Sequence, residues 1–169
     1  MTAGGSTSCA CRRRCTKRGP ISASPDYRHR KRDGRLGGGC FAFWPVFAAR
    51  HAGRSEGFVL GPDGLAQIYA ENVVGTSTVM ARTALLRAEG GFDEGLVQAE
   101  DWDLWLRLAA RAPVGCVPAV LAEYLQHRPG NLSQAAAARA RAMRDVAARH
   151  APAARALDPL VGVLAGEFA

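Results

Sequence analysis

The sequence predicts an α/β domain, in which amphipathic helices pack with short buried strands. Of its 169 residues 48% are hydrophobic, which is enough for the core of one domain. Leu104, Trp105 and Leu108 recur at the spacing of one helix face. Residues 114–117 form a short apolar run between two prolines, as expected for a buried strand.

Charge divides the chain into two unlike parts. Residues 1–40 hold ten Lys or Arg and two Asp, a net charge of +8, whereas residues 41–169 hold twelve Arg and thirteen acidic residues, a net charge of −1. The first part is rich in Gly, Ser and Arg, and this composition predicts disorder. It is either a nucleic-acid-binding arm or the product of a wrong start site or shifted reading frame, and the second interpretation is favoured. The near-neutral remainder makes nucleic acid an unlikely partner.

The five cysteines do not predict a metal site. Cys9, Cys11 and Cys15 lack the paired spacing and nearby histidines of a zinc site, and Cys40 stands apart from them. Cys116 lies in the apolar run and is expected to be a small buried side chain.

No segment is expected to cross a membrane. The longest apolar stretch, residues 41–49, has nine residues and contains a proline, whereas a spanning helix needs about 20. The N-terminus lacks the apolar core of a signal peptide. A cytoplasmic location is therefore the expectation, and residues 41–57 predict no particular element.

Two helices are expected in the middle of the chain. A turn cluster at residues 61–64 precedes the first, from Leu65 to Glu71. The second is expected to be capped by Ser77 or Thr78 and to run to Ala88. A following glycine in the left-handed conformation would end it.

The next helix is expected to begin at Glu100 and Asp101. Acidic residues favour the first turn of a helix, where unpaired amides and the helix dipole are positive. Pro113 ends this helix. Either acid could be a general base for a hydroxyl nucleophile, or it could act on the helix alone.

The last part of the chain predicts two strands and a helix. Residues 114–117 and 120–124 are the expected strands. Ser133 is placed to cap a helix from Gln134 to Ala148, which is rich in Ala and Arg. Residues 151–169 are read as a tail.

A series of short motifs, in order, resembles family 2 glycosyltransferases over about residues 57–133. The motifs are Asn72-x3-Thr76-Ser77-Thr78-Val79-Met80-x-Arg82, Gly90-Gly91-Phe92-Asp93-Glu94, Glu100-Asp101-Trp102-Asp103-Leu104-Trp105-Leu106-Arg107, Val117-Pro118, Tyr124 and His127-x2-Gly130-Asn131-Leu132-Ser133. Each motif is short, and their order and spacing together give the resemblance its specificity.

The resemblance implies a fold and a reaction. The fold is the Rossmann-like nucleotide-diphospho-sugar transferase fold, GT-A, present here in part. The reaction transfers a sugar from a nucleotide-diphosphate sugar to an acceptor hydroxyl of a glycan or lipid, with inversion. Asp101 corresponds to the catalytic base, and Glu100 would orient or assist it.

The resemblance also implies binding residues. Gly90, Gly91 and Phe92 would line the acceptor side. Trp102 would flank the acceptor or, equally, pack in the core. His127 would approach the donor diphosphate or lie in a surface loop.

A metal site is not expected in this chain, although the family uses Mg²⁺ or Mn²⁺. Asp101-Trp102-Asp103 matches the family's Asp-x-Asp signature. That signature normally ends a hydrophobic strand, whereas this match opens a helix and already supplies the base motif. It is therefore assigned to the base and not to metal.

The donor-binding half of the family has no counterpart in residues 1–56. The expected division is a basic, disordered or misassigned segment 1–56, the C-terminal half of a glycosyltransferase domain 57–150, and the tail. Such a fragment is expected to be inactive alone and to self-associate through exposed faces. The alternative function is a non-catalytic binding remnant of the fold.

Overall fold

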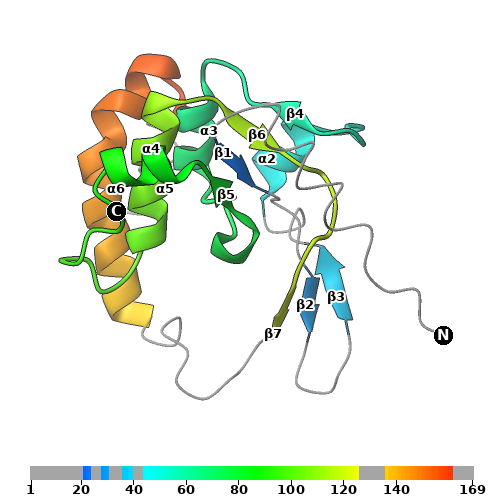
Figure 1. Ribbon diagram of the computed structural model, residues 1–169, viewed down its shortest axis with the longest axis horizontal. Coiled ribbons are helices and arrows are strands. Elements are labelled where there is room, and N and C mark those ends of the chain that lie inside the picture. Colours follow the sequence, from blue (N-terminus) through cyan, green and yellow to red (C-terminus); the bar gives the residue numbers. More distant parts are fainter. Residues whose placement is uncertain (1–20, 24–27, 31–35, 40–43, 126–135, 162–169) are drawn as a thin grey trace.

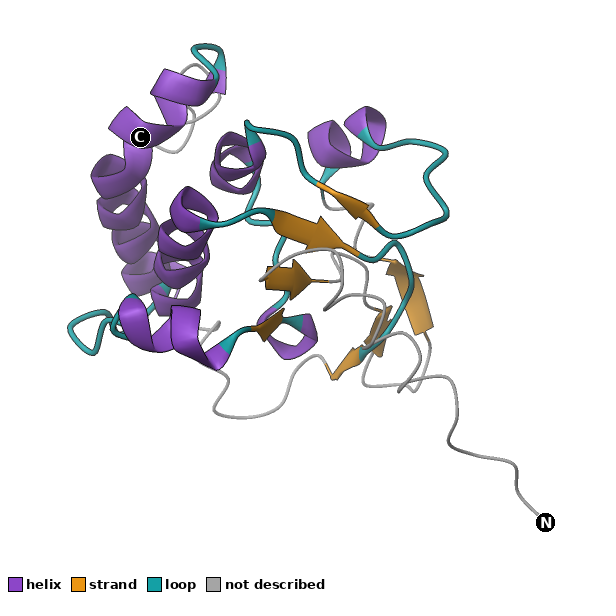
Figure 2. Ribbon diagram, turned by 45° about the horizontal axis from the view of Figure 1, so that its top comes forward, coloured by secondary structure: helices purple, strands orange, loops and turns teal. Residues whose placement is uncertain are grey.

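Most helices gather on one side of the molecule in the computed structural model, which describes residues 21–23, 28–30, 36–39, 44–125 and 136–161, whereas α2 (Pro45–Arg50) lies among the strands (Figure 1). Helix α6 (Ala136–Leu157) is outermost and packs on α3 (Gly64–Ala70) and α5 (Glu100–Arg111). The strands lie beyond α3 and α5 (Figures 1 and 2). The predictions for Cys9, Cys11, Cys15, Cys40 and His127 fall outside the described residues.

The strands form two small sheets. The first has the order β4-β6-β1-β5 and contains β4 (Phe58–Val59), β6 (Val114–Cys116), β1 (Ile21–Ala23) and β5 (Met80–Ala81). The second has the order β3-β2-β7 and contains β3 (Leu36–Gly39), β2 (Arg28–Arg30) and β7 (Glu123–Leu125). Each sheet mixes parallel and antiparallel pairs, and the molecule combines these small sheets with helices. The GT-A fold stays a prediction.

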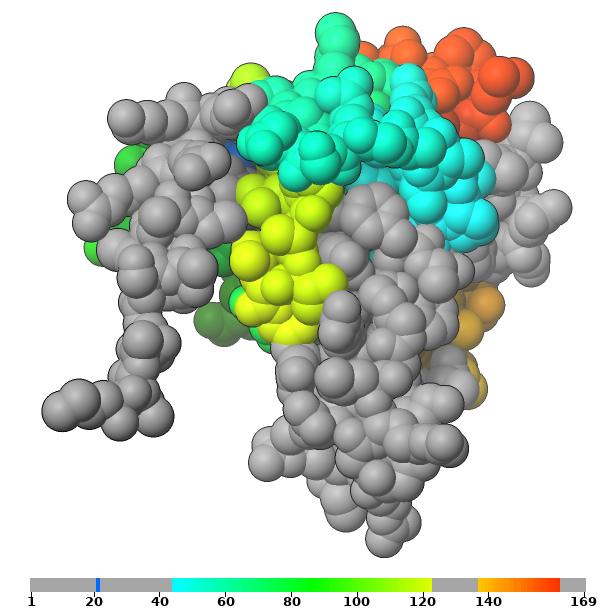
Figure 3. Space-filling model, turned by 90° about the vertical axis from the view of Figure 1, so that its right-hand side faces the viewer, coloured from blue at the N-terminus to red at the C-terminus, as the bar shows by residue number. Residues whose placement is uncertain are grey.

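The pairing brings distant segments together. Ile21 lies opposite Val114 in the parallel pair and opposite Ala81 in the antiparallel pair. Phe58 lies opposite Cys116, and the space-filling view shows these two parts of the chain meeting on one face (Figure 3).

The expectation that residues 1–56 lack regular structure is wrong for the segments that form β1, β2 and β3. β1 pairs only with the distant strands β5 and β6, which leaves no local signal for it. β2 pairs with the distant β7 and also with its neighbour β3, but both strands have few residues. A further element, α2 (Pro45–Arg50), begins with a proline at its first helical position. The carboxylate of Glu71 accepts hydrogen bonds from the amides of Val46 and Phe47 at 3.1 and 2.7 Å, which satisfies donors of its first turn.

Helix α5 confirms the expected apolar stripe. Leu104, Trp105 and Leu108 are all buried, together with Leu106. Cys116 is also buried, as expected, and burial raises the pKa of its thiol to about 12. A thiol in that environment stays protonated at neutral pH.

Helix α4 (Thr83–Ala88) ends as predicted and begins later than predicted. Gly90 and Gly91 have φ angles of +77° and +73°, and their amides bond to Arg87 and Leu86 in the pattern of a glycine-terminated helix. The expected cap at Ser77 or Thr78 is wrong. Residues Thr76–Thr78 form a 3-10 turn, η2, in which the Thr78 hydroxyl donates to the carbonyl of Gly75 at 2.7 Å.

Helix α6 continues past the predicted end at Ala148, so the domain boundary at residue 150 is also wrong. Pro152 lies inside the helix and removes one amide donor. Ala154 and Val146 of this helix are buried in the core, and the Tyr69 hydroxyl of α3 donates to the carbonyl of Ala147 at 3.0 Å. Within the described ranges, no helix is long and apolar enough to cross a membrane.

Candidate functional site

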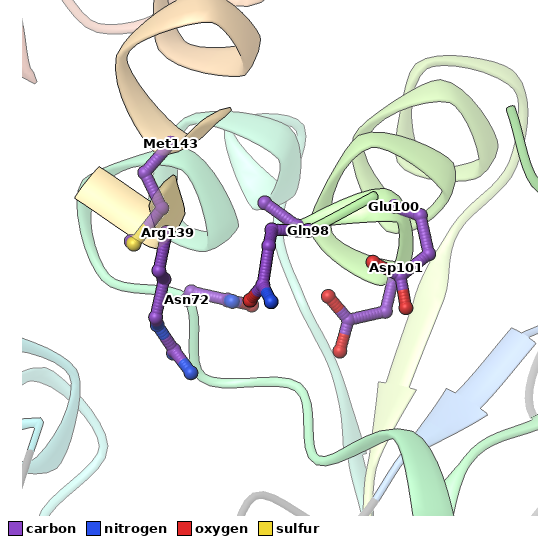
Figure 4. A pocket seen from close by; sticks show the side chains of 7 residues that line it. Asn72, Gln98, Glu100, Asp101, Arg139 and Met143 are labelled. Carbon is purple, nitrogen blue, oxygen red and sulfur yellow. The ribbon is translucent and has the colours of Figure 1, made fainter. Parts of the chain in front are cut away.

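A polar hollow of about 160 Å³ lies at the start of α5 (Figure 4). Glu100 and Asp101 form one side of it, next to Gln98 and Asn72 from the connecting loops. Arg139 and Met143 of α6 approach from the other side. At roughly 30 Å³ per water molecule, this volume holds about five waters, or one six-membered ring.

The carboxylate of Asp101 already accepts a hydrogen bond from an aliphatic hydroxyl. Thr76 Oγ1 donates to Asp101 Oδ2 at 2.6 Å. The other oxygen, Oδ1, accepts from the backbone amide of Trp102 at 2.7 Å, which holds the carboxylate at the helix entrance. Thr76 is exposed, so a hydroxyl from a ligand can replace or join it.

Two local features of the hollow are unusual for a purely structural surface. Ala99 precedes α5 with a φ angle of +60°, a left-handed conformation that costs a non-glycine residue about 1–2 kcal/mol. Asn72 Oδ1 is a buried acceptor without a hydrogen-bond donor. Strained residues and unsatisfied buried polar atoms are both enriched at functional sites.

Trp102 does not face the hollow, and its role beside an acceptor is not supported. The side chain is 5% exposed, and its indole Nε1 donates to the carbonyl of Ile68 at 3.0 Å. Its ring packs at 6.0 Å from that of Tyr69. Of the two expected roles, the structure therefore favours core packing.

The double-glycine bend also lies outside the hollow. Arg107, on a different side of α5 from Asp101, donates to the carbonyls of Glu89 at 2.5 Å and Gly91 at 2.8 Å. Phe92 is half-exposed and meets Trp105 edge to face at 6.1 Å. The double-glycine bend, with Phe92, thus lies against α5, away from the hollow that Glu100 and Asp101 line.

Asp103 is fully buried in an ion-pair network between α5 and α6. Its Oδ2 accepts from Arg107 Nε at 2.8 Å. Its Oδ1 accepts from Arg149 Nη1 at 3.0 Å and is 2.8 Å from His150 Nε2. Arg149 also binds Asp93, so the network joins the loop after α4 to both helices.

The two carboxylates of the Asp-x-Asp match, Asp101 and Asp103, have different surroundings. Both oxygens of Asp103 are already bound by cationic or imidazole groups, while Asp101 faces the hollow. Among the described residues, no three His, Cys, Asp or Glu side chains converge as metal ligands. Asp103 is therefore held by Arg107, Arg149 and His150 and does not join Asp101 at the hollow.

The Asp103 carboxyl should make stability depend on pH. Burial by itself would raise its pKa, but hydrogen bonds from His150 and Arg107 outweigh burial and lower the pKa below its ordinary value of about 3.9. A lowered pKa in the folded state contributes stability that is present above the ordinary value and lost as pH falls through the folded value.

We expect the loss of unfolding free energy caused by Asp103→Asn to be larger at pH 7 than at pH 3.5, because the contribution of the carboxylate is lost as pH falls below its ordinary pKa. Urea unfolding of wild type and variant at pH 7 and pH 3.5 measures this difference in free energy. A difference of equal size at the two pH values would contradict the assigned role of the charge.

Sequence reasoning missed four residues of the hollow, Gln98, Ala99, Arg139 and Met143. Gln98 lies in the loop before α5, and Arg139 and Met143 come from α6. The spacing of Arg139 and Met143 by four residues places them on one helix face, which is the only signal in the sequence that could have paired them.

Comparison of the chain with protein-family models, with curated proteins and with solved structures found no match.

Proposed function

We propose that this chain is the acceptor-side part of a glycosyltransferase that moves a sugar from a nucleotide-diphosphate sugar to an acceptor hydroxyl, with inversion. The observation that carries the proposal is the hydroxyl-bonded carboxylate of Asp101 at a hollow the size of one ring. The ordered motifs of family 2 glycosyltransferases supply the reaction class. The GT-A fold and a cytoplasmic location belong to the same proposal.

The roles follow from the chemistry of the hollow. Asp101 accepts the proton of the acceptor hydroxyl as that oxygen attacks the anomeric carbon of the donor, and the nucleoside diphosphate leaves. Glu100, in the same helix turn, orients the acceptor or assists Asp101. The hollow is too small for a nucleotide, so the donor has to be held by other residues.

A second candidate is a non-catalytic binding module. The observation that favours it is the separation of the double-glycine bend and the buried Trp102 from the hollow, which leaves fewer acceptor contacts than the family resemblance implies. In this alternative, the hollow binds a sugar ring without reacting with it.

The proposal is tested by completing the enzyme. The chain is combined with the donor-binding half of a family 2 glycosyltransferase, and transfer of a radiolabelled sugar to a panel of glycan acceptors is measured. Product of inverted anomeric configuration is the expected result. Sugar binding without any product in the combined protein would favour the binding module.

A further inference from the structure

The hollow carries an unpaired cation opposite its acidic side. Arg139 lines it from α6 and has no ion-pair partner among the described residues, in contrast to Arg107 and Arg149. Figure 4 shows the Arg139 guanidinium on one side of the hollow and the carboxylates of Glu100 and Asp101 on the other. The hollow is therefore positively charged at the α6 side and negatively charged at the α5 side.

We propose that the hollow selects a sugar ring that carries an anionic substituent, a carboxylate or a phosphate. This inference rests on the proposed function, because it names the class of acceptor that the same site takes. A guanidinium recognises both anions through paired N–H donors. Asn72 and Gln98 add uncharged polar side chains between the two charged sides of the hollow.

The charges also fix how such a ring lies. The two carboxylates repel an anion and attract hydroxyl donors, whereas Arg139 attracts the anion. The anionic group consequently points to α6, and a hydroxyl on the opposite side of the ring points to Asp101. A neutral ring lacks this preference and can bind in several orientations.

Helix α6 provides a matched control. Arg141 is exposed and lies two residues further along the helix, which turns it about 200° away from Arg139. Arg139→Gln and Arg141→Gln remove the same charge from the same helix, but only the first changes the hollow.

The test is calorimetric titration of the full chain with glucuronate, glucose 6-phosphate and glucose at constant ionic strength. We expect at least one of the two anionic sugars to bind about tenfold more tightly than glucose, as one charge-assisted contact allows. The tighter of the two identifies carboxylate or phosphate as the preferred group. Arg139→Gln should abolish the preference, and Arg141→Gln should retain it.

Three results would overturn the inference: equal affinity for glucose and both anionic sugars, absence of binding by all three, or equal losses in the two arginine variants. Circular dichroism of each variant establishes that it is folded. Because these titrations measure no turnover, a preference for the anion can hold even where the completed enzyme fails to transfer sugar. The two proposals can therefore fail separately.

Discussion

Asp101→Asn is expected to lower the rate of sugar transfer by the completed enzyme by about 10²–10⁴-fold, the range for loss of a general base. Asparagine has nearly the same shape as aspartate, and its amide oxygen can still accept a hydrogen bond from the Thr76 hydroxyl. The amide cannot, however, take up the proton of the sugar acceptor's hydroxyl. Acceptor binding should change little, so the loss should appear in kcat. The rate is measured at saturating acceptor.

The matched control is Glu100→Gln, which removes the same charge from the same helix turn. We expect it to reduce transfer less than Asp101→Asn, because Glu100 orients and does not take the proton. Unfolding of Asp101→Asn should differ from wild type by less than about 1 kcal/mol, since the residue is partly exposed. Equal and small rate losses in the two variants would point to the charge of the helix entrance instead of a base.

Asp103→Ala should lower the free energy of unfolding by about 3 kcal/mol, at the lower end of the range for breaking a buried ion pair. The carboxylate is fully buried, and its removal leaves Arg107 and His150 without their shared acceptor. Arg149 is half-exposed and keeps its contact with Asp93, which limits the loss. Urea unfolding at pH 7 measures the change.

Asp145→Ala is the control for this variant. Asp145 is exposed on α6, so its removal should change stability by less than about 0.5 kcal/mol. A loss for Asp103→Ala as small as that for Asp145→Ala would show that the network between α5 and α6 contributes little to the fold.

Elements with local causes could be predicted from the sequence. The start of α5 follows from Glu100 and Asp101, and Pro113 lies just beyond its end. The end of α4 follows from the left-handed Gly90 and Gly91. In each case, the residues that cause the boundary are next to it.

Elements with distant causes could not be predicted. Strands β1 and β5 contain three and two residues, and they form because Ile21 pairs with Val114 and Ala81. Helix α6 runs past Ala148 because Ala154 is buried in tertiary contacts. Composition and periodicity contain neither kind of information.

The candidate site was predicted in part, for the same reason. Asp101 and Glu100 were identified from the ordered motifs, and both line the hollow. The sequence leaves Trp102 with two equal roles, because an aromatic residue at the start of a helix does not show which way its side chain points. Arg139 was missed because only the packing of α6 brings it to this side of α5.

Binding of a sugar ring with a hydroxyl at Asp101 is tested most directly by nuclear magnetic resonance mapping of the isotope-labelled chain during titration with glucuronate. We expect the backbone amide shifts to gather at the residues that line the hollow, Asn72, Gln98, Glu100, Asp101 and Arg139. We also expect Gly91 and Phe92 to stay unchanged. Shifts that gather at Gly91 and Phe92 and leave Asp101 unchanged would contradict such binding.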